Sequence, residues 1–368
     1  MNRRPQQSRS SYDAFSHTSR FRASAPDTRF FDARKKRTLH SRAILLLIAV
    51  LAFAFLINFV CNFFVFTSRI SIPVTGLTEA FSGYTILHIS DLKGESFGSN
   101  QSRLIAALGD TDYDAVLLTG DMVSPLGNAQ PLYALIDALK AHRPNTPIYF
   151  IAGDSDPEPL SMIHAASGSP LAPWVLGAQQ RGAVWLSAPQ QITRGTQSIW
   201  FCTSAQLNLD INTMQPQYEQ RYLNALAEDN DSEIELATLS LRQLEDLRSA
   251  RNVMTSSDVY VALTHVPPMK EELQGQAASQ IDLLLCGHYL GGLLRLPGIG
   301  PAFIPSQSDS LYGLFPGDDM RSGLSRIGRT AVYVNPGLGS SEELYPPLFF
   351  RLFNPPTVTL ISLTPSSL

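Results

Sequence analysis

The feature that most constrains this chain is an unbroken apolar run, AILLLIAVLAFAFLINFVCNFFVF, over residues 43–66. It holds 24 residues and no charged side chain, and about 20 apolar residues suffice for a helix to cross the hydrocarbon core of a bilayer. A cleaved signal peptide has a shorter apolar stretch, of about 7–15 residues, followed by a small-x-small cleavage site, which is lacking here. We therefore predict a transmembrane helix over residues 43–66.

The charge before this run predicts the orientation of the chain. Residues 1–42 carry eleven Arg or Lys against three Asp, and the basic cluster 34–37 ends close to the apolar run. The positive-inside rule places such a segment in the cytoplasm, so we expect a single-pass protein of the cell membrane with its C-terminal domain on the extracytoplasmic side. The tail is rich in Ser, Arg and Gln and has no helical or strand period, so we expect disorder over residues 1–42.

The composition of the rest excludes some classes of function. Beyond the tail the chain carries 17 basic and 29 acidic side chains, a balance that argues against nucleic acid as a partner. The cysteines, at positions 61, 202 and 286, are scattered and form no C-x-x-C motif. Neither a disulfide framework nor a cysteine metal site is predicted.

After a predicted linker over residues 67–78, a domain over residues 79–368 shows alternating strand and helix patterns. Short apolar runs rich in Val, Ile and Tyr, each ending in a sharp polar turn, predict buried strands; they cover residues 84–90, 115–119, 148–152, 259–264, 281–286 and 330–335. Amphipathic stretches predict helices over residues 101–108, 131–142 and 239–250. This alternation indicates the α/β class. Residues 205–254 are polar and acidic, which predicts a surface insertion with helical parts.

Five of the predicted strands end in side chains that can bind a metal: Asp91, Asp121, Asp154, His265 and His288. Functional groups gather where parallel strands end, and carboxylates with imidazoles suit Zn, Mn or Fe. Glycines precede three of them and allow the backbone to turn sharply. The alternatives are turn or cap roles for the aspartates and core roles for the histidines. His88, inside a strand, is expected in the core.

These motifs, taken in order, resemble those of the calcineurin-like metallophosphoesterases, and in particular their membrane-anchored bacterial branch. That family has D-x-H, G-D-x-x-D, G-N-H-[DE], T/S-H-x-P and G-H-x-H-G-G. Here the corresponding segments are residues 91–93, 120–124, 153–156, 264–267 and 287–292. Further similarity lies at residues 295–301, 333–341 and 351–363, and the insertion alone falls outside it. The resemblance implies a four-layer αββα sandwich and metal-dependent hydrolysis of phosphoesters.

The departures from the family pattern fall on catalytic positions. Lys93, Ser155 and Leu290 stand where the family has histidines, and Asp154 replaces an asparagine. By the resemblance, one metal position keeps Asp121, Asp154, His265 and His288, while the other keeps only Asp91 and Asp121. We expect one divalent ion at most (Mn, Zn or Fe), with none as the alternative. We hypothesise that the Lys93 ammonium offsets the charge of Asp91 and Asp121 in place of the second metal; an exposed loop lysine is the alternative.

Three functions follow as hypotheses. The first is a phosphoester hydrolase with a depleted dinuclear site. Ser155 has no suitable pKa for acid catalysis at neutral pH, so ordinary phosphoesters would be hydrolysed weakly. The second is a catalytically inactive pseudo-phosphoesterase that binds a ligand or partner, and the third is a structural membrane component with the insertion as its interaction surface. Because the domain is tethered to the lipid bilayer by its anchor, the expected ligand is a membrane or envelope phosphoester.

Overall fold

The computed structural model describes residues 28–124, 126–161, 168–273, 280–296, 300–304, 313–315, 321–340 and 351–366. The expected disorder of residues 1–27 lies outside the described part. The chain divides into two compact units, Met1–Phe53 and Ala54–Leu368, each of which is considered by itself.

The N-terminal helix α1, Thr28–Phe63, is longer than predicted at its start. Residues 28–42 contain no Pro or Gly, so the helix extends backwards from the apolar run, because adding a residue to an existing helix is easier than starting one. The expected disorder of residues 28–42 is therefore wrong. Among the described residues, Ser41–Val60 is a stretch long and apolar enough to cross a membrane, with a mean hydropathy of 2.9.

The C-terminal boundary of α1 and the predicted linker also need correction. The helix ends at Phe63 instead of residue 66, and strand β1, Phe66–Thr75, occupies most of the expected linker. β1 runs parallel to β15, Thr357–Ser366, along its whole length. The sheet therefore begins almost directly after the helix.

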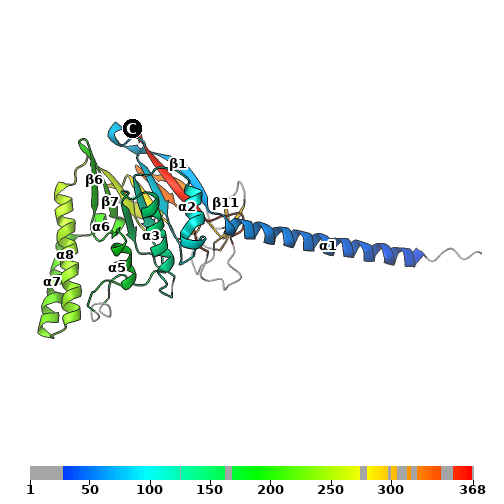
Figure 1. The fold of residues 1–368 in the computed structure, drawn as a ribbon, viewed down its shortest axis with the longest axis horizontal. Helices are drawn as coiled ribbons and strands as arrows, with labels where there is room; N and C mark the ends of the chain where they lie inside the picture. Colours follow the sequence, from blue (N-terminus) through cyan, green and yellow to red (C-terminus); the bar gives the residue numbers. More distant parts are fainter. Residues whose placement is uncertain are drawn as a thin grey trace, which may run out of the picture. The chain divides into compact units, whose positions relative to one another are not determined.

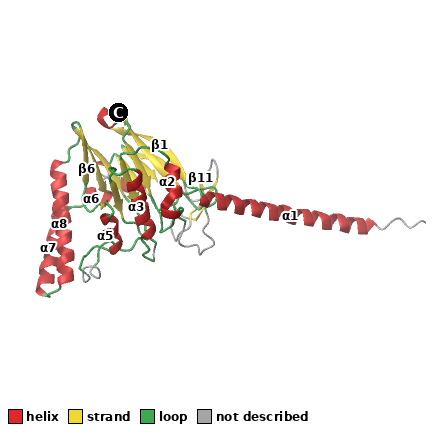
Figure 2. Cartoon of the chain, in the orientation of Figure 1, coloured by secondary structure: helices red, strands yellow, loops and turns green. Residues whose placement is uncertain are grey.

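Two six-stranded mixed sheets form the body of the second unit, and their presence confirms the predicted α/β class (Figures 1 and 2). The first has the order β1, β15, β2 (Thr85–Ile89), β3 (Ala115–Thr119), β4 (Ile148–Ile151) and β5 (Ala183–Trp185). The second has the order β13 (Gly323–Ile327), β14 (Thr330–Val334), β9 (Leu283–Cys286), β8 (Val259–Leu263), β7 (Gln197–Thr203) and β6 (Gln190–Arg194).

The central strands of both sheets are parallel. β2 to β5 pair in parallel, as do β7, β8, β9 and β14. Their chain directions therefore bring the predicted site residues to the ends of neighbouring strands. A separate, small antiparallel sheet consists of β10 (Leu294–Leu296), β11 (Gly300–Ile304) and β12 (Gly313–Leu314).

The core is divided by the sheets. One buried cluster joins side chains of both, such as Leu117 of β3 and Val261 of β8, so the two sheets pack on each other through apolar contacts. Another cluster packs three helices on the first sheet: α2 (Ser102–Leu108), α3 (Gln130–His142) and α5 (Pro173–Gln180). Burying these apolar side chains is the main force that holds the layers together.

The acidic insertion between β7 and β8 consists of helices. α6 (Ser204–Asn208) precedes α7 (Ile211–Ala227) and α8 (Asp231–Val253), and the last two lie side by side (Figure 1). The side chains of Asp210 and Asn230 accept backbone N–H groups at the starts of α7 and α8, as N-caps do. The insertion is thus a helical hairpin.

Candidate metal centre

The five predicted site residues lie together at the carboxyl ends of the parallel strands. Asp91, Asp121 and Asp154 follow β2, β3 and β4, and His265 and His288 follow β8 and β9. Their ligand atoms form two groups, each with all atoms within 4.8 Å of one another: Asp154 with both histidines, and Asp91 with Asp121 and His265. Residues from both sheets therefore build one centre.

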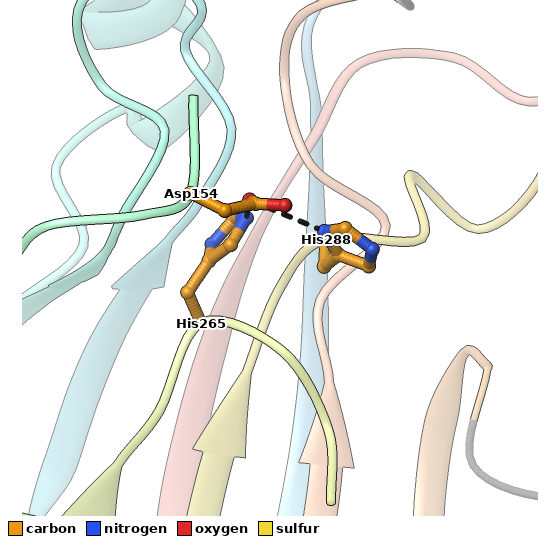
Figure 3. A group of neighbouring side chains, drawn as sticks. All are labelled: Asp154, His265 and His288. Atoms are coloured by element: carbon orange, nitrogen blue, oxygen red, sulfur yellow. Dashed lines mark ion pairs between the residues drawn. The ribbon is translucent and has the colours of Figure 1, made fainter. Parts of the chain in front are cut away.

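Asp154, His265 and His288 face one another (Figure 3). The Oδ1 atom of Asp154 lies 2.9 Å from Nε2 of His265 and 3.4 Å from Nδ1 of His288. Ligand atoms around a tetrahedral metal with bonds of about 2.0–2.1 Å are about 3.3 Å apart. The three side chains thus have the spacing of metal ligands.

The backbone fixes the orientation of His265. Its Nδ1 lies 2.8 Å from the carbonyl oxygen of Thr119, which can only accept, so Nδ1 carries a proton and Nε2 points toward the carboxylates. Nε2 is buried and lies between two carboxylates, 3.2 Å from Oδ2 of Asp121 and 2.9 Å from Oδ1 of Asp154. Histidine ligands of metals commonly donate their second nitrogen to a carbonyl in this way.

The charges around His265 favour a cation at Nε2. Burial alone would lower the pKa of His265, but Asp121 and Asp154 outweigh burial and raise the pKa well above its usual value. Contacts with His265 and His288 in turn hold the pKa of Asp154 far below its usual range. A proton or a divalent metal supplies the positive charge that this arrangement requires, and the donor set fits one ion.

Glycines allow the strand ends to approach each other. Gly120 has a φ of +88°, which L side chains rarely adopt. A Cβ on Gly153 would lie 2.1 Å from Oδ1 of Asp121, and a Cβ on Gly287 would lie 1.8 Å from Oγ of Ser90. The sharp turn predicted from the sequence applies to Gly120, while Gly153 and Gly287 are required by close contact.

The other half of the centre surrounds Asp121. Two residues that differ from the family pattern, Lys93 and Ser155, contact its carboxylate. Nζ of Lys93 lies 2.8 Å from Oδ2 of Asp121, and these side chains are only 10% and 1% exposed. Ser155 donates its backbone N–H to Oδ1 at 2.9 Å and its hydroxyl to Oδ2 at 3.1 Å. Burial raises the pKa of Asp121, but His265 and Lys93 outweigh it and keep the pKa below its usual range.

The remaining residues of that half offer few ligand atoms. Leu290 is buried and has no donor atom. Oδ2 of Asp91 accepts the hydroxyl of Ser90 at 2.6 Å and the backbone N–H of His288 at 3.1 Å. Oδ2 of Asp91 thus helps to hold the loop after β9, while Oδ1 is buried without a hydrogen-bond partner among the described residues. Apart from the shared His265, this half offers only the carboxylates of Asp91 and Asp121, and Lys93 already pairs with Asp121.

Sequence reasoning missed two supporting residues. Asp156 accepts the N–H groups of Val123 at 2.7 Å and Gly153 at 2.8 Å, and so joins the loops after β3 and β4; burial raises its pKa to about 6. The fully buried Arg351 donates to the carbonyls of Pro336 at 2.8 Å and Leu290 at 3.3 Å. The sequence offered one signal for each residue. Asp156 closes the G-D-S-D motif, and Arg351 begins the family-like segment 351–363.

His88 is a core residue, as predicted. It is fully buried, and its Nε2 lies 2.9 Å from the hydroxyl oxygen of Thr119. Burial lowers the pKa of His88 to about 3. Thr119 therefore separates two histidines, with the buried His88 on its hydroxyl and the site residue His265 on its carbonyl.

Similarity to known proteins is limited in extent. No protein-family model matches the chain. A stretch of 103 residues is 34% identical to "Phosphodiesterase YaeI" of Escherichia coli (strain K12), covering 28% of this chain and 32% of that protein. The chain thus matches about a third of the length of this relative. The stretch supports, at a coarse level, a phosphoesterase-like family.

Among solved structures, a phosphopantetheinyl hydrolase (PptH) from Mycobacterium tuberculosis is similar with a TM-score of 0.33 and 11% sequence identity. The similarity covers 69% of this chain and 91% of that chain.

Proposed function

We propose that this chain is a membrane-anchored metallophosphoesterase that holds one divalent ion, Mn, Zn or Fe, in a four-layer αββα domain. The proposed ligands are Asp121, Asp154, His265 and His288. The observation that carries the proposal is the buried Nε2 of His265, on which two carboxylates converge, Asp154 at 2.9 Å and Asp121 at 3.2 Å, beside the imidazole of His288. The partial match to a phosphodiesterase supports the class of reaction.

A metal ion bound there would supply Lewis-acid polarisation of a phosphoryl oxygen and a more acidic water. The chain's own residues define its place. Thr119 orients His265 through the carbonyl contact, and Asp154 links the two imidazoles. On the other side, the Lys93 ammonium neutralises Asp121 and provides a fixed positive charge for an anionic ligand.

The proposed activity is slow. General acid catalysis contributes about 10²–10⁴ in rate, and Ser155, which stands at the position of the family's histidine, donates its hydroxyl to Asp121. We propose as ligand a phosphoester of the membrane or envelope, because α1 contains a stretch apolar enough to span the bilayer. From the basic tail and the positive-inside rule we also propose that the N-terminus is cytoplasmic and the domain extracytoplasmic.

A second candidate is a pseudo-phosphoesterase that binds a phosphoester without cleaving it. The observation that favours it is the engagement of both Asp121 oxygens by Lys93 and Ser155. That arrangement leaves Asp121 less available to bridge two metals.

One experiment separates the candidates. The full chain is reconstituted in lipid nanodiscs, its bound Mn, Zn and Fe are measured, and generic phosphodiesters are assayed with and without added metal. Metal-dependent turnover by the unmodified chain would establish the hydrolase. Metal binding without turnover would establish the pseudo-phosphoesterase, and a chain that binds no metal would overturn the proposed site.

A further inference from the structure

A cavity of about 400 Å³ lies beside the metal centre, and His265 is one of its lining residues. Part of its lining comes from the ends of strands in both sheets: Ala152 after β4, Trp185 of β5 and Leu263 of β8. It therefore lies at the same strand ends as Asp154 and His265. Its volume falls within the range of cavities that hold small organic ligands.

The helical insertion supplies one wall of this cavity. Tyr218 projects from α7, and Ser240, Gln243, Leu244 and Leu247 project from α8. The insertion is the segment that lies outside the family resemblance. The insertion thus shapes the space next to the candidate metal centre.

The lining is uncharged apart from His265. The described lining residues are aliphatic, aromatic, or bear a hydroxyl or amide group, and no Asp, Glu, Lys or Arg is among them. A charged ligand group would lose its hydration there without an ion-pair partner. The cavity therefore favours an uncharged organic group.

Gln243 adds a requirement for polarity. Its Nε2 is buried and has no hydrogen-bond partner among the described residues. A buried N–H group without an acceptor is unfavourable, and a purely aliphatic chain would leave it so. A ligand group that carries a carbonyl or hydroxyl oxygen would satisfy it once the side chain of Gln243 turns its amide into the cavity that it lines.

We propose that this cavity is a specificity pocket for the uncharged, acceptor-bearing organic group of a phosphoester, whose phosphate lies at the metal centre. The inference rests on the proposed function, because the centre must hold the phosphate. It assigns the α7–α8 hairpin to ligand selection, with Gln243 as a specificity-determining residue.

Three phosphodiester probes with a common methyl phosphate group test the pocket: dimethyl phosphate, methyl octyl phosphate and thymidine 5′-methyl phosphate. Thymidine is an uncharged group with carbonyl and hydroxyl acceptors. Dissociation constants are measured with the full chain in nanodiscs, loaded with Mn²⁺, by the relaxation of the ³¹P signals. We expect the thymidine ester to bind at least tenfold more tightly than the other two.

Two variants locate the binding. Gln243→Leu should weaken the thymidine ester about tenfold, the equivalent of one neutral hydrogen bond. Ser240→Phe should fill the cavity and abolish the advantage of the thymidine ester. The matched control is Thr238→Phe, because Thr238 donates its hydroxyl to the carbonyl four residues earlier as Ser240 does, but is exposed and outside the cavity.

The outcomes separate the two proposals. If dimethyl phosphate shows no Mn²⁺-dependent relaxation, the metal centre fails, and the proposed function fails with it. If dimethyl phosphate binds but the thymidine ester gains nothing, the pocket is overturned while the centre stands. Tighter binding of the octyl ester than of the thymidine ester, or an equal loss in Ser240→Phe and Thr238→Phe, would also overturn the pocket.

Discussion

The two halves of the centre differ in what surrounds their carboxylates. Around Asp154, two imidazoles converge on a side chain that is 52% exposed, with Nε2 of His265 at 2.9 Å and Nδ1 of His288 at 3.4 Å from Oδ1. Around Asp121, an ammonium, a hydroxyl and a backbone N–H already occupy the oxygens. The first half has the donors of a metal site, and in the second the protein itself supplies a cation to Asp121.

This difference shows how a cluster of acidic residues can lose a metal ligand and remain stable. Buried carboxylates need a positive partner, because a charge removed from water is costly unless it is paired. Lys93 provides that partner for Asp121 at 2.8 Å. Asp121 therefore has a positive partner without a second metal ion.

The largest effect is expected from rebuilding the second half. Lys93→His, Ser155→His and Leu290→His, combined with Asp154→Asn, should raise phosphodiester turnover by about 10²–10⁴ and increase the bound metal from one ion to two. Leu290 has a φ of +54°, a conformation that histidine adopts more often than leucine does. Turnover assays and elemental analysis are the measurements.

A matched control for this variant carries Leu290→Phe in place of Leu290→His. Phenylalanine supplies a ring without a ligand nitrogen, so it should restore neither the second ion nor the rate. Equal turnover in both variants would mean that the second metal position has no part in the gain.

The first half is tested by removing one imidazole. His265→Ala should weaken Mn²⁺ binding by more than about 100-fold, since losing even a residue that supports a ligand reduces affinity about 10–100-fold. Calorimetric titration of the full chain measures the change. His88→Ala is the control, because His88 is also buried but its ring contacts Thr119 and Tyr333 in place of the carboxylates. A similar loss in both variants would point to general damage to the fold.

The role of Lys93 is tested by removing its charge. Lys93→Met should lower the free energy of unfolding by roughly 3 kcal/mol, the lower end of the range for breaking a buried ion pair. Urea denaturation measures the effect. Lys140→Met, which removes an ammonium that donates to the carbonyl of Thr146 at 2.9 Å, should have a smaller effect. Equal stabilities of the Lys93 variant and the parent would show that Asp121 needs no ammonium.

The last prediction concerns pH and the buried His88, which lies outside both halves of the centre. His88 has a pKa of about 3 in the folded chain and about 6.5 when unfolded. Between these values the unfolded state takes up a proton that the folded state does not, so stability falls as the pH falls from about 6.5 toward 3, by at most about 1.4 kcal/mol per unit. His88→Gln should lack this contribution. The stability difference between the parent and the variant should therefore shift in favour of the variant on acidification, and a difference independent of pH would contradict the assignment.

Much of this arrangement follows from the sequence because of strand burial. Runs such as residues 115–119, apolar up to Thr119, form the buried β3, and the parallel strands bring Asp121 and His265 close together at their carboxyl ends. By contrast, β1 contains Arg69 and Pro73 and was predicted as a linker, because its pairing with β15 joins segments from opposite ends of the domain. Local pattern carries no signal for so distant a partner.

The contacts that distinguish the two halves were also hard to predict. The orientation of His265 depends on the carbonyl of Thr119, and every residue has such a carbonyl. The contact between Lys93 and Asp121 was proposed from the departing motif, but the additional contacts of Ser155 were not. The contacts of Ser155 with Asp121 join two different loops, and such contacts depend on how the strands before those loops are positioned in three dimensions.

The number of metal ions bound per chain tests the central claim most directly. The full chain in nanodiscs is equilibrated with Mn²⁺, freed of excess metal and measured by elemental analysis against protein concentration, in parallel with His265→Ala. We predict one ion per chain in the parent and none in the variant. Two ions per chain would contradict the replacement of the second metal by Lys93, and no ion in the parent would contradict the site at Asp154, His265 and His288.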